Sequence, residues 1–292
     1  MKLGAICFLT EYSISPAELG RELENHGFES LWVGDHSHIA IEPGTSAPLD
    51  TRTGQPVPTH YSHLMDPFLA LTHAAATTHR IRLGTSICLV NERDPITTAK
   101  AVATLDCLSG GRFFFGVGAG WNAQEMRDHG TDPSTRLPLL KERLAAMKQI
   151  WTEDVAEYQG DLVQFGPMMC WPKPIQKPYP PIFLGGNFKN IPRVVDYADG
   201  WIPSTTVAPA RAFLDKIGEL QRQAEAAGRG PLPVTAVYVT DVDRLADGEG
   251  VFTDQQWDEY ETAGVDRVVL MLPPDRKAAL QLAERYARFA ER

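Results

Sequence analysis

Gly110–Glu125 reads GGRFFFGVGAGWNAQE, and this stretch decides the fold. The Gly110-Gly111 pair can adopt the left-handed conformation that ends a helix, and the apolar run Arg112–Phe115 is typical of a buried parallel strand. Alternating glycines over Gly116–Gly120 leave one face of the strand's end without side chains, so a ligand or neighbouring backbone can come close. The stretch predicts a helix stop, a strand and a glycine loop, which suits either a plain turn or a site for a flat ring.

The glycine loop leads into the start of another helix. Asn122 is a good N-cap residue, and Glu125 stands three positions later, where a capping-box partner belongs. The dinucleotide-binding fingerprint does not fit, because Trp121 occupies the place of its third glycine. The chain also lacks a G-x-S-x-G nucleophile elbow, and none of its cysteines stands in a known catalytic motif.

Strand-like and helix-like runs alternate along the whole chain. The expected strands begin at Lys2, Ser30, Arg82, Arg112, Pro181, Gly200, Pro233 and Arg267. The expected helices cover about 16–26, 66–78, 95–108, 137–151, 191–198, 209–227, 254–263 and 275 to the C-terminus. Eight β-then-α units predict an α/β protein, a closed (β/α)8 TIM barrel forming one domain over 1–292. Function is then expected at the C-terminal mouth, where we also place two long loop insertions, about 37–65 and 152–180.

The composition favours a small-molecule enzyme. A net charge of −9 disfavours nucleic acid and anionic membranes as partners, since both require a basic surface. The four cysteines form no C-x-x-C pair, and the N-terminus has no apolar stretch typical of a signal peptide. No apolar run approaches the length of a membrane span. We therefore expect a cytoplasmic protein with reduced thiols.

The second expected strand ends in Asp35-His36-Ser37-His38, which places two imidazoles and a carboxylate at the mouth. Because His-x-His can chelate a metal from a barrel strand, a metal-dependent hydrolase is one alternative. The later strand ends offer no histidine, although His60 and His63 on the long loop could complete a ligand set. We interpret His36 as an acid/base or hydrogen-bonding residue rather than a metal ligand, and a purely structural histidine stays open.

Two further strand ends carry candidate features. Thr85-Ser86-Ile87 ends the third strand, where an irregular backbone could support a ring. Leu184-Gly185-Gly186-Asn187 ends the fifth strand, and Lys189 and Arg193 follow at the start of a short helix. Bare backbone N–H groups, a helix N-terminus and two cations favour a phosphate site, with a plain turn beside surface cations as the alternative.

Four segments together carry a family resemblance. They are LWVGDH at 31–36, MDPFLALTHAAATTHRIRLGTSICLV at 65–90, RDPITTAKAVATLDCLSGGRFFFGVGAGWN at 93–122 and PPIFLGGN at 180–187. The chain resembles the luciferase-like monooxygenase superfamily nearly end to end, and specifically its branch of coenzyme F-420 (deazaflavin) dependent oxidoreductases. The resemblance implies a luciferase-like barrel that binds a flavin or deazaflavin at its mouth, often as a homodimer.

The resemblance also implies roles for single residues. Asp35 and His36 match a catalytic pair beside the reactive carbon of the ring, and Ser86-Ile87 matches a bulge with a non-prolyl cis peptide behind it. The implied cofactor-binding residues are Asp35, Ser86, Ile87, Gly118, Ala119, Gly120, Gly185, Gly186 and Asn187, the last three receiving the cofactor's phosphate. Trp121 stands where the family's sugar-phosphate dehydrogenases carry a catalytic Glu, so it disfavours that substrate class. We assign Trp121, His38 and Tyr61 to the substrate side.

The implied reaction is hydride transfer between coenzyme F-420 and an unidentified small organic substrate. In this hypothesis His36, steered by Asp35, gives or takes the accompanying proton. An FMNH2-dependent two-component monooxygenase, supplied with reduced flavin by a partner reductase, is the alternative. Beside the small-molecule substrate, the expected partners are a second copy of the chain and a flavin or F-420 reductase.

Overall fold

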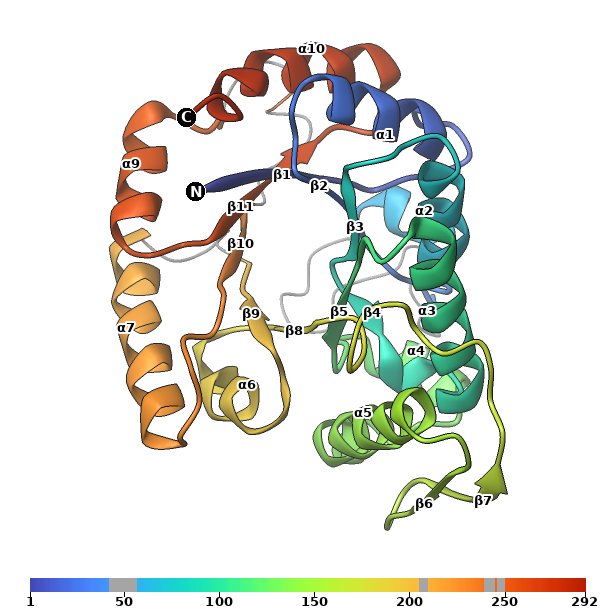
Figure 1. The fold of residues 1–292 in the computed structure, drawn as a ribbon. Helices are drawn as coiled ribbons and strands as arrows, with labels where there is room; N and C mark the ends of the chain where they lie inside the picture. The colour runs from blue at the N-terminus through green and yellow to red at the C-terminus, as the bar shows by residue number, and fades with distance from the viewer. Residues whose placement is uncertain (42–56, 205–209, 239–244, 246–249) are drawn as a thin grey trace.

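The computed structural model describes residues 1–41, 57–204, 210–238, 245 and 250–292. Its parallel sheet runs in the order β10-β11-β1-β2-β3-β5-β8-β9, and isolated parallel bridges Trp201–Val234 and Ser204–Val237 join β9 to β10. These strands are β1 (Lys2–Cys7), β2 (Ser30–Val33), β3 (Arg82–Thr85), β5 (Phe113–Gly118), β8 (Ile182–Gly185), β9 (Gly200–Ile202), β10 (Thr235–Tyr238) and β11 (Arg267–Leu272). The predicted eight-strand parallel barrel is confirmed, as a nearly closed ring (Figure 1).

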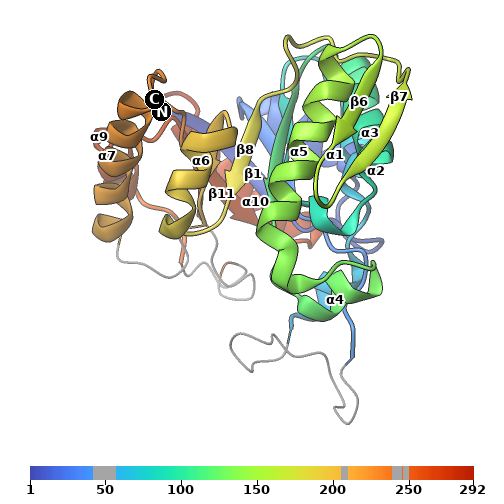
Figure 2. The same ribbon diagram turned by 90° about the horizontal axis from the view of Figure 1, so that it is seen from below.

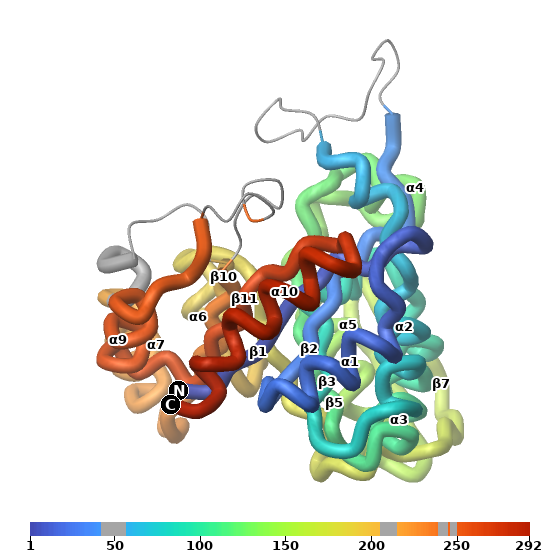
Figure 3. Tube along the Cα trace, turned by 90° about the horizontal axis from the view of Figure 1, so that it is seen from above, coloured from blue at the N-terminus to red at the C-terminus, as the bar shows by residue number. Residues whose placement is uncertain are grey.

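Helices cover the outside of this ring, except α4 (Ala123–Asp128), which lies at its mouth (Figure 2). In chain order the helices are α1 (Pro16–Asn25), α2 (Pro67–Ala75), α3 (Pro95–Ser109), α4 (Ala123–Asp128), α5 (Arg136–Thr152), α6 (Ile191–Tyr197), α7 (Ala210–Ala226), α9 (Asp254–Thr262) and α10 (Arg276–Tyr286). Short 3-10 turns are η1 (Thr59–His63), η2 (Val90–Glu92), η3 (Pro133–Thr135), η4 (Phe188–Asn190) and η5 (Ala287–Phe289). Figure 3 shows α1 and α10 side by side beside β1, with the two chain termini close together. None of the helices in the described ranges is long and apolar enough to cross a membrane.

The opening stretch folds as its sequence predicts. Helix α3 ends at Ser109, and Gly110 and Gly111 both have positive φ, 69° and 78°, which only glycine adopts easily. All six residues of β5 are buried, as expected for a strand covered on both faces. Asn122 caps α4 by accepting hydrogen bonds from the backbone N–H groups of the second and third helical residues.

Large rings fill the barrel interior. Trp32 of β2 stacks on Phe114 of β5 at 5.7 Å between ring centroids, and Phe183 of β8 packs edge-on against Phe114 at 5.4 Å. Gly84 of β3 makes this possible, because a Cβ there would lie 2.3 Å from the Trp32 ring. The guanidinium of Arg267 lies over the Phe114 ring, and two hydrogen bonds to Glu29 fix its position. The interior is therefore a packed core rather than a channel.

The two long insertions lie at opposite ends of the barrel. The segment 37–65 follows β2 and so stands at the C-terminal mouth; its residues 42–56 lie outside the described part of the chain. The segment 152–180 was also expected at the mouth, and that expectation is wrong. It follows α5 and leads into β8, so it stands at the N-terminal end of the strands. It contains an antiparallel hairpin of β6 (Ala156–Gln159) and β7 (Gln164–Met168), which Figure 2 shows at the end opposite α4.

Candidate functional site

Asp35 lies at the mouth, at the end of β2, but it is turned into the protein. Its carboxylate accepts hydrogen bonds from Nε and Nη2 of Arg93 at 3.0 and 2.7 Å and from the Leu89 N–H at 2.9 Å. The Asp35 side chain is only 2% exposed. Although burial opposes the charge, the hydrogen bonds to Asp35 raise the pKa of Arg93. Asp35 therefore anchors the segment that follows β3 and does not steer His36, which corrects our hypothesis.

Glu125 of α4 is the carboxylate that contacts His36. Its Oε2 lies 2.8 Å from Nδ1 of His36, and its Oε1 accepts the Ser37 N–H at 2.9 Å. The expected capping box does not form, because the Glu125 side chain is used here instead. Burial raises the pKa of Glu125, but the hydrogen bond and charge of His36 outweigh it and leave that pKa lowered. An ionised Glu125 can only accept a hydrogen bond, so Nδ1 of His36 carries the proton that is donated to it. In the neutral imidazole the lone pair is then on Nε2.

Two aromatic residues close around His36. The Trp121 ring lies 5.6 Å from the His36 ring, edge to face, and the Tyr61 ring lies 5.3 Å from it, tilted. The His36 side chain is therefore only 7% exposed. His38 lies further out on the rim, where its Nε2 is 3.0 Å from Asp128. Of the three residues assigned to the substrate side, the structure brings Trp121 and Tyr61 to His36 and places His38 against α4.

The peptide bond between Ser86 and Ile87 is cis, as the resemblance implies. The Ile87 side chain fills the space beside the glycines of two neighbouring strands. A Cβ on Gly118 would lie 1.8 Å from Ile87 Cδ1, and one on Gly185 would lie 2.8 Å from Ile87 Cγ2. These glycines admit a side chain of the protein itself, whereas the sequence suggested a ligand or backbone. A positive φ of 76° explains Gly120 separately.

The loop after β8 keeps the features expected of a phosphate site. Gly186 has a φ of 112°, and both Gly186 and Asn187 are exposed. The Asn187 side chain accepts the Lys189 N–H at 3.0 Å, and Asn190 donates to the Gly185 carbonyl at 2.9 Å. These contacts fix the loop with backbone open to solvent. Its binding of phosphate stays a prediction.

Sequence reasoning missed Arg93 and Glu92 as members of the site. Arg93 also binds Asp66, the N-cap of α2, at 3.0 Å through Nη1, so it joins two strand-to-helix connections. Glu92 is 7% exposed and lies beside Glu125. The signal that could have indicated both is a pair of charged residues directly after an apolar strand run, at the end that becomes the mouth of the barrel.

The histidines at the mouth have partners other than a metal. His36 is held by Glu125, His38 by Asp128, and His129 by Ser37, whose Oγ lies 2.6 Å from its Nε2. Among the residues that the structure describes, no group of three or more His, Cys, Asp or Glu side chains is arranged to hold a metal ion.

The fold is a parallel (β/α)8 barrel whose mouth carries a carboxylate-bound histidine and a non-prolyl cis peptide. The profile of the luciferase-like monooxygenase family matches residues 15–243, and the chain belongs to this family. A solved F420-dependent secondary alcohol dehydrogenase in complex with an F420-acetone adduct shares the fold, with a TM-score of 0.75, 18% identity and 100% of each chain covered.

Two of the relatives in sequence carry names with different cofactors, and a third is uncharacterized. An uncharacterized protein of Mycobacterium tuberculosis is 40% identical over 95% of this chain and 94% of its own. An F420-dependent glucose-6-phosphate dehydrogenase of Kineococcus radiotolerans is 28% identical over 73% of this chain and 59% of its own. An FMNH2-dependent dimethylsulfone monooxygenase of Pseudomonas putida is 30% identical over 56% and 45%. The chain is accordingly an oxidoreductase of the luciferase-like family.

Proposed function

We propose that this protein transfers hydride between coenzyme F-420 and a small organic substrate, with His36 as the acid/base residue. The observation that carries the proposal is the hydrogen bond between His36 Nδ1 and Glu125. It fixes the ring and leaves Nε2 without a hydrogen bond to any described residue, so this atom can give or take a proton. The F420-dependent relative of Kineococcus radiotolerans supports the choice of cofactor.

The residues at the mouth fit a flat, phosphate-bearing cofactor. Ser86, Ile87 and Ala119 are partly exposed around the cis peptide and would face its ring, while Gly186-Asn187 and Lys189 would hold its phosphate. When bound, a deazaflavin supplies a carbon centre that donates or accepts hydride. The protein's own residues position the proton of His36 and exclude water from it with Trp121 and Tyr61.

The half-buried Trp121 beside His36 favours an apolar or aromatic substrate. A tryptophan ring offers a flat apolar surface and one N–H donor, but no negative charge. We propose a substrate without a sugar phosphate, whose reacting carbon would exchange hydride with the bound cofactor.

The alternative is an FMNH2-dependent two-component monooxygenase, and the Pseudomonas putida relative supports it. Titration of the purified protein with F-420 and FMN, each oxidised and reduced, separates the two. We expect F-420 to bind at least tenfold more tightly than FMN in both redox states. Tight FMN binding without a response to F-420 would overturn the main proposal and require a partner reductase.

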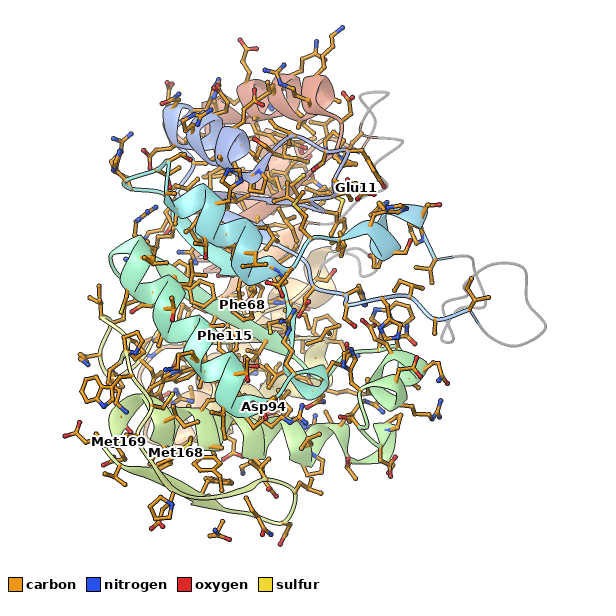
Figure 4. All side chains as sticks on the ribbon, turned by 90° about the vertical axis from the view of Figure 1, so that its right-hand side faces the viewer. Glu11, Phe68, Asp94, Phe115, Met168 and Met169 are labelled. Carbon is orange, nitrogen blue, oxygen red and sulfur yellow. The ribbon has the colours of Figure 1, made fainter. Side chains whose placement is uncertain are left out.

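We also propose that the protein is a cytoplasmic homodimer. Exposed apolar side chains lie on one side of the barrel: Leu69 of α2 is 73% exposed, Leu108 of α3 63%, and Met169 after β7 73%. Figure 4 looks onto this side, with Asp94 at the start of α3 and Met168 and Met169 on the hairpin side. Light scattering should give twice the chain mass, and Leu108→Asp should reduce the measured mass to that of a single chain.

The proposed cytoplasmic location rests on the cysteines. Each of the four cysteines is a free thiol, which suits a reducing compartment.

A further inference from the structure

Glu92, the last residue of η2, is a buried acid for which the proposed reaction has no use. It is 7% exposed, and neither of its carboxyl oxygens has a hydrogen-bond partner among the described residues. A Cβ on Gly120 of the glycine loop would lie 3.2 Å from Glu92 Oε1, so the side chain lies under that loop. The carboxyl group of Glu125 lies beside it, close enough for a hydrogen bond when one of the two acids carries a proton.

The charges around Glu92 do not support a second negative charge. Asp35 and Glu125 both face it from other elements, while Arg93, its neighbour in sequence, directs its guanidinium to Asp35 and Asp66. Arg143 of α5 packs against η2 but donates to the carbonyl oxygens of Val90 and Arg93. Among the described residues no cation forms an ion pair with Glu92, and burial together with the neighbouring carboxylates outweighs the attraction of Arg93.

We propose that Glu92 is a positioning residue that carries a proton, donates it in a hydrogen bond to Glu125, and so keeps a single negative charge on the carboxylate that holds His36. The pair Glu92–Glu125 then shares one proton and one charge, as two neighbouring buried carboxyl groups do. Its contribution to catalysis rests on the proposed role of His36; the proton on Glu92 does not.

The ionisation of the two acids agrees with this arrangement. Burial, and after it the negative charge of Glu125, raise the pKa of Glu92 to about 9. The pKa of Glu125 is lowered, because its bonds to His36 and Ser37, together with Glu92, outweigh its burial. Near neutral pH Glu92 is the protonated member. Above about pH 9 it ionises, and repulsion between the two carboxylates disturbs the contact of Glu125 with His36.

Nuclear magnetic resonance of the ligand-free full chain tests the proposal without any cofactor. With 13C-labelled glutamate carboxyl groups, one carboxyl signal should titrate near pH 9 in the wild type and be missing in Glu92→Gln. With 15N-labelled histidine, the His36 ring signals should respond in the same pH range in the wild type and stay constant in Glu92→Gln. Glu157→Gln, at an exposed position of β6, is the matched control and should leave both transitions in place.

Activity provides a separate arm. Glu92→Gln keeps a neutral donor and should retain wild-type turnover within about threefold, whereas Glu92→Ala should lose at least tenfold. A wild-type Glu92 carboxyl that titrates below pH 6 would overturn the proposal, and so would a His36 transition near pH 9 that persists in Glu92→Gln. If Glu92→Gln does not fold, the wild-type carboxyl titration still decides the protonation. If the carboxyl and histidine signals titrate as expected but the protein does not respond to F-420, the proton on Glu92 stays supported and only the proposed function is overturned.

Discussion

Glu125 Oε2 and His36 Nδ1 lie 2.8 Å apart, although the two residues are separated by 89 positions in the chain and come from different strand-to-helix connections. The Glu125 side chain is fully buried, so the contact is not screened by water. The carboxylate orients the imidazole, and in the proposed reaction it would stabilise the charge that the imidazole gains with a proton.

The first prediction concerns this contact. His36→Ala should lower kcat by about 10²–10⁴-fold, the usual contribution of a positioned acid/base group, and change the Kd of the cofactor by only a few-fold. Glu125→Ala should cost about tenfold or more by itself and almost nothing in the His36→Ala background, because residues that act as a unit are not additive. Turnover of a substrate that the wild-type protein accepts gives kcat, and the change in cofactor fluorescence on binding gives Kd. Unchanged turnover of His36→Ala would contradict the proposed role.

The second prediction concerns the ion pair between Asp35 and Arg93. Asp35→Asn removes the buried partner of the half-buried Arg93 guanidinium and leaves it with one carboxylate, Asp66, instead of two. Removing one partner of a buried ion pair costs several kcal/mol, and we expect the free energy of unfolding to fall by about 3 kcal/mol. Urea denaturation measures it. Asp196→Asn breaks the exposed pair with Lys141 and should change it by less than about 1 kcal/mol, so similar losses in both variants would refute the expected difference.

The third prediction is the pH dependence of stability that Glu92 causes. Its pKa rises from 4.5 to about 9 on folding, so between these values the native state binds one proton more than the unfolded state. Stability from this group is therefore full below about pH 4.5 and is lost as the pH rises toward 9. Glu92→Gln does not titrate, so its stability relative to the wild type should increase with pH by up to about 1.4 kcal/mol per pH unit.

Urea titrations at pH 5, 7 and 9 would measure this difference, with Glu157→Gln as the control that should follow the wild type. A constant difference between Glu92→Gln and the wild type over this range would show that Glu92 ionises normally in the native state.

The fold could be predicted from the sequence because its signals are local. The glycine pair Gly110-Gly111 ends a helix whatever surrounds it, and the apolar run of β5 is buried in any parallel sheet. The partner of His36 could not be predicted in this way. Asp35 is its neighbour in sequence, but consecutive residues leaving a strand point in opposite directions, so Asp35 turned inward and His36 toward the mouth.

Glu125 and Ile87 show the same limit. Glu125 stands at a capping-box position, and its local pattern gives no sign that its side chain turns to another loop. The glycines at 118 and 185 predicted space beside the backbone, and only the tertiary structure shows that Ile87 occupies it. A pattern of residues can indicate that something approaches closely, but the identity of the approaching group depends on which strands become neighbours.

The fourth prediction tests that account of Gly118. Because its Cβ would lie 1.8 Å from Ile87 Cδ1, Gly118→Ala should reduce the free energy of unfolding by about 1–3 kcal/mol, as overpacking of a core does. Ile87→Val removes the Cδ1 methyl group and alone should cost about 1 kcal/mol. In the double variant the added methyl replaces the lost one, so its cost should be at least about 1 kcal/mol smaller than the sum of the single costs. Urea denaturation of the four proteins measures this coupling. Strict additivity would show that Ile87 is not the reason for glycine at position 118.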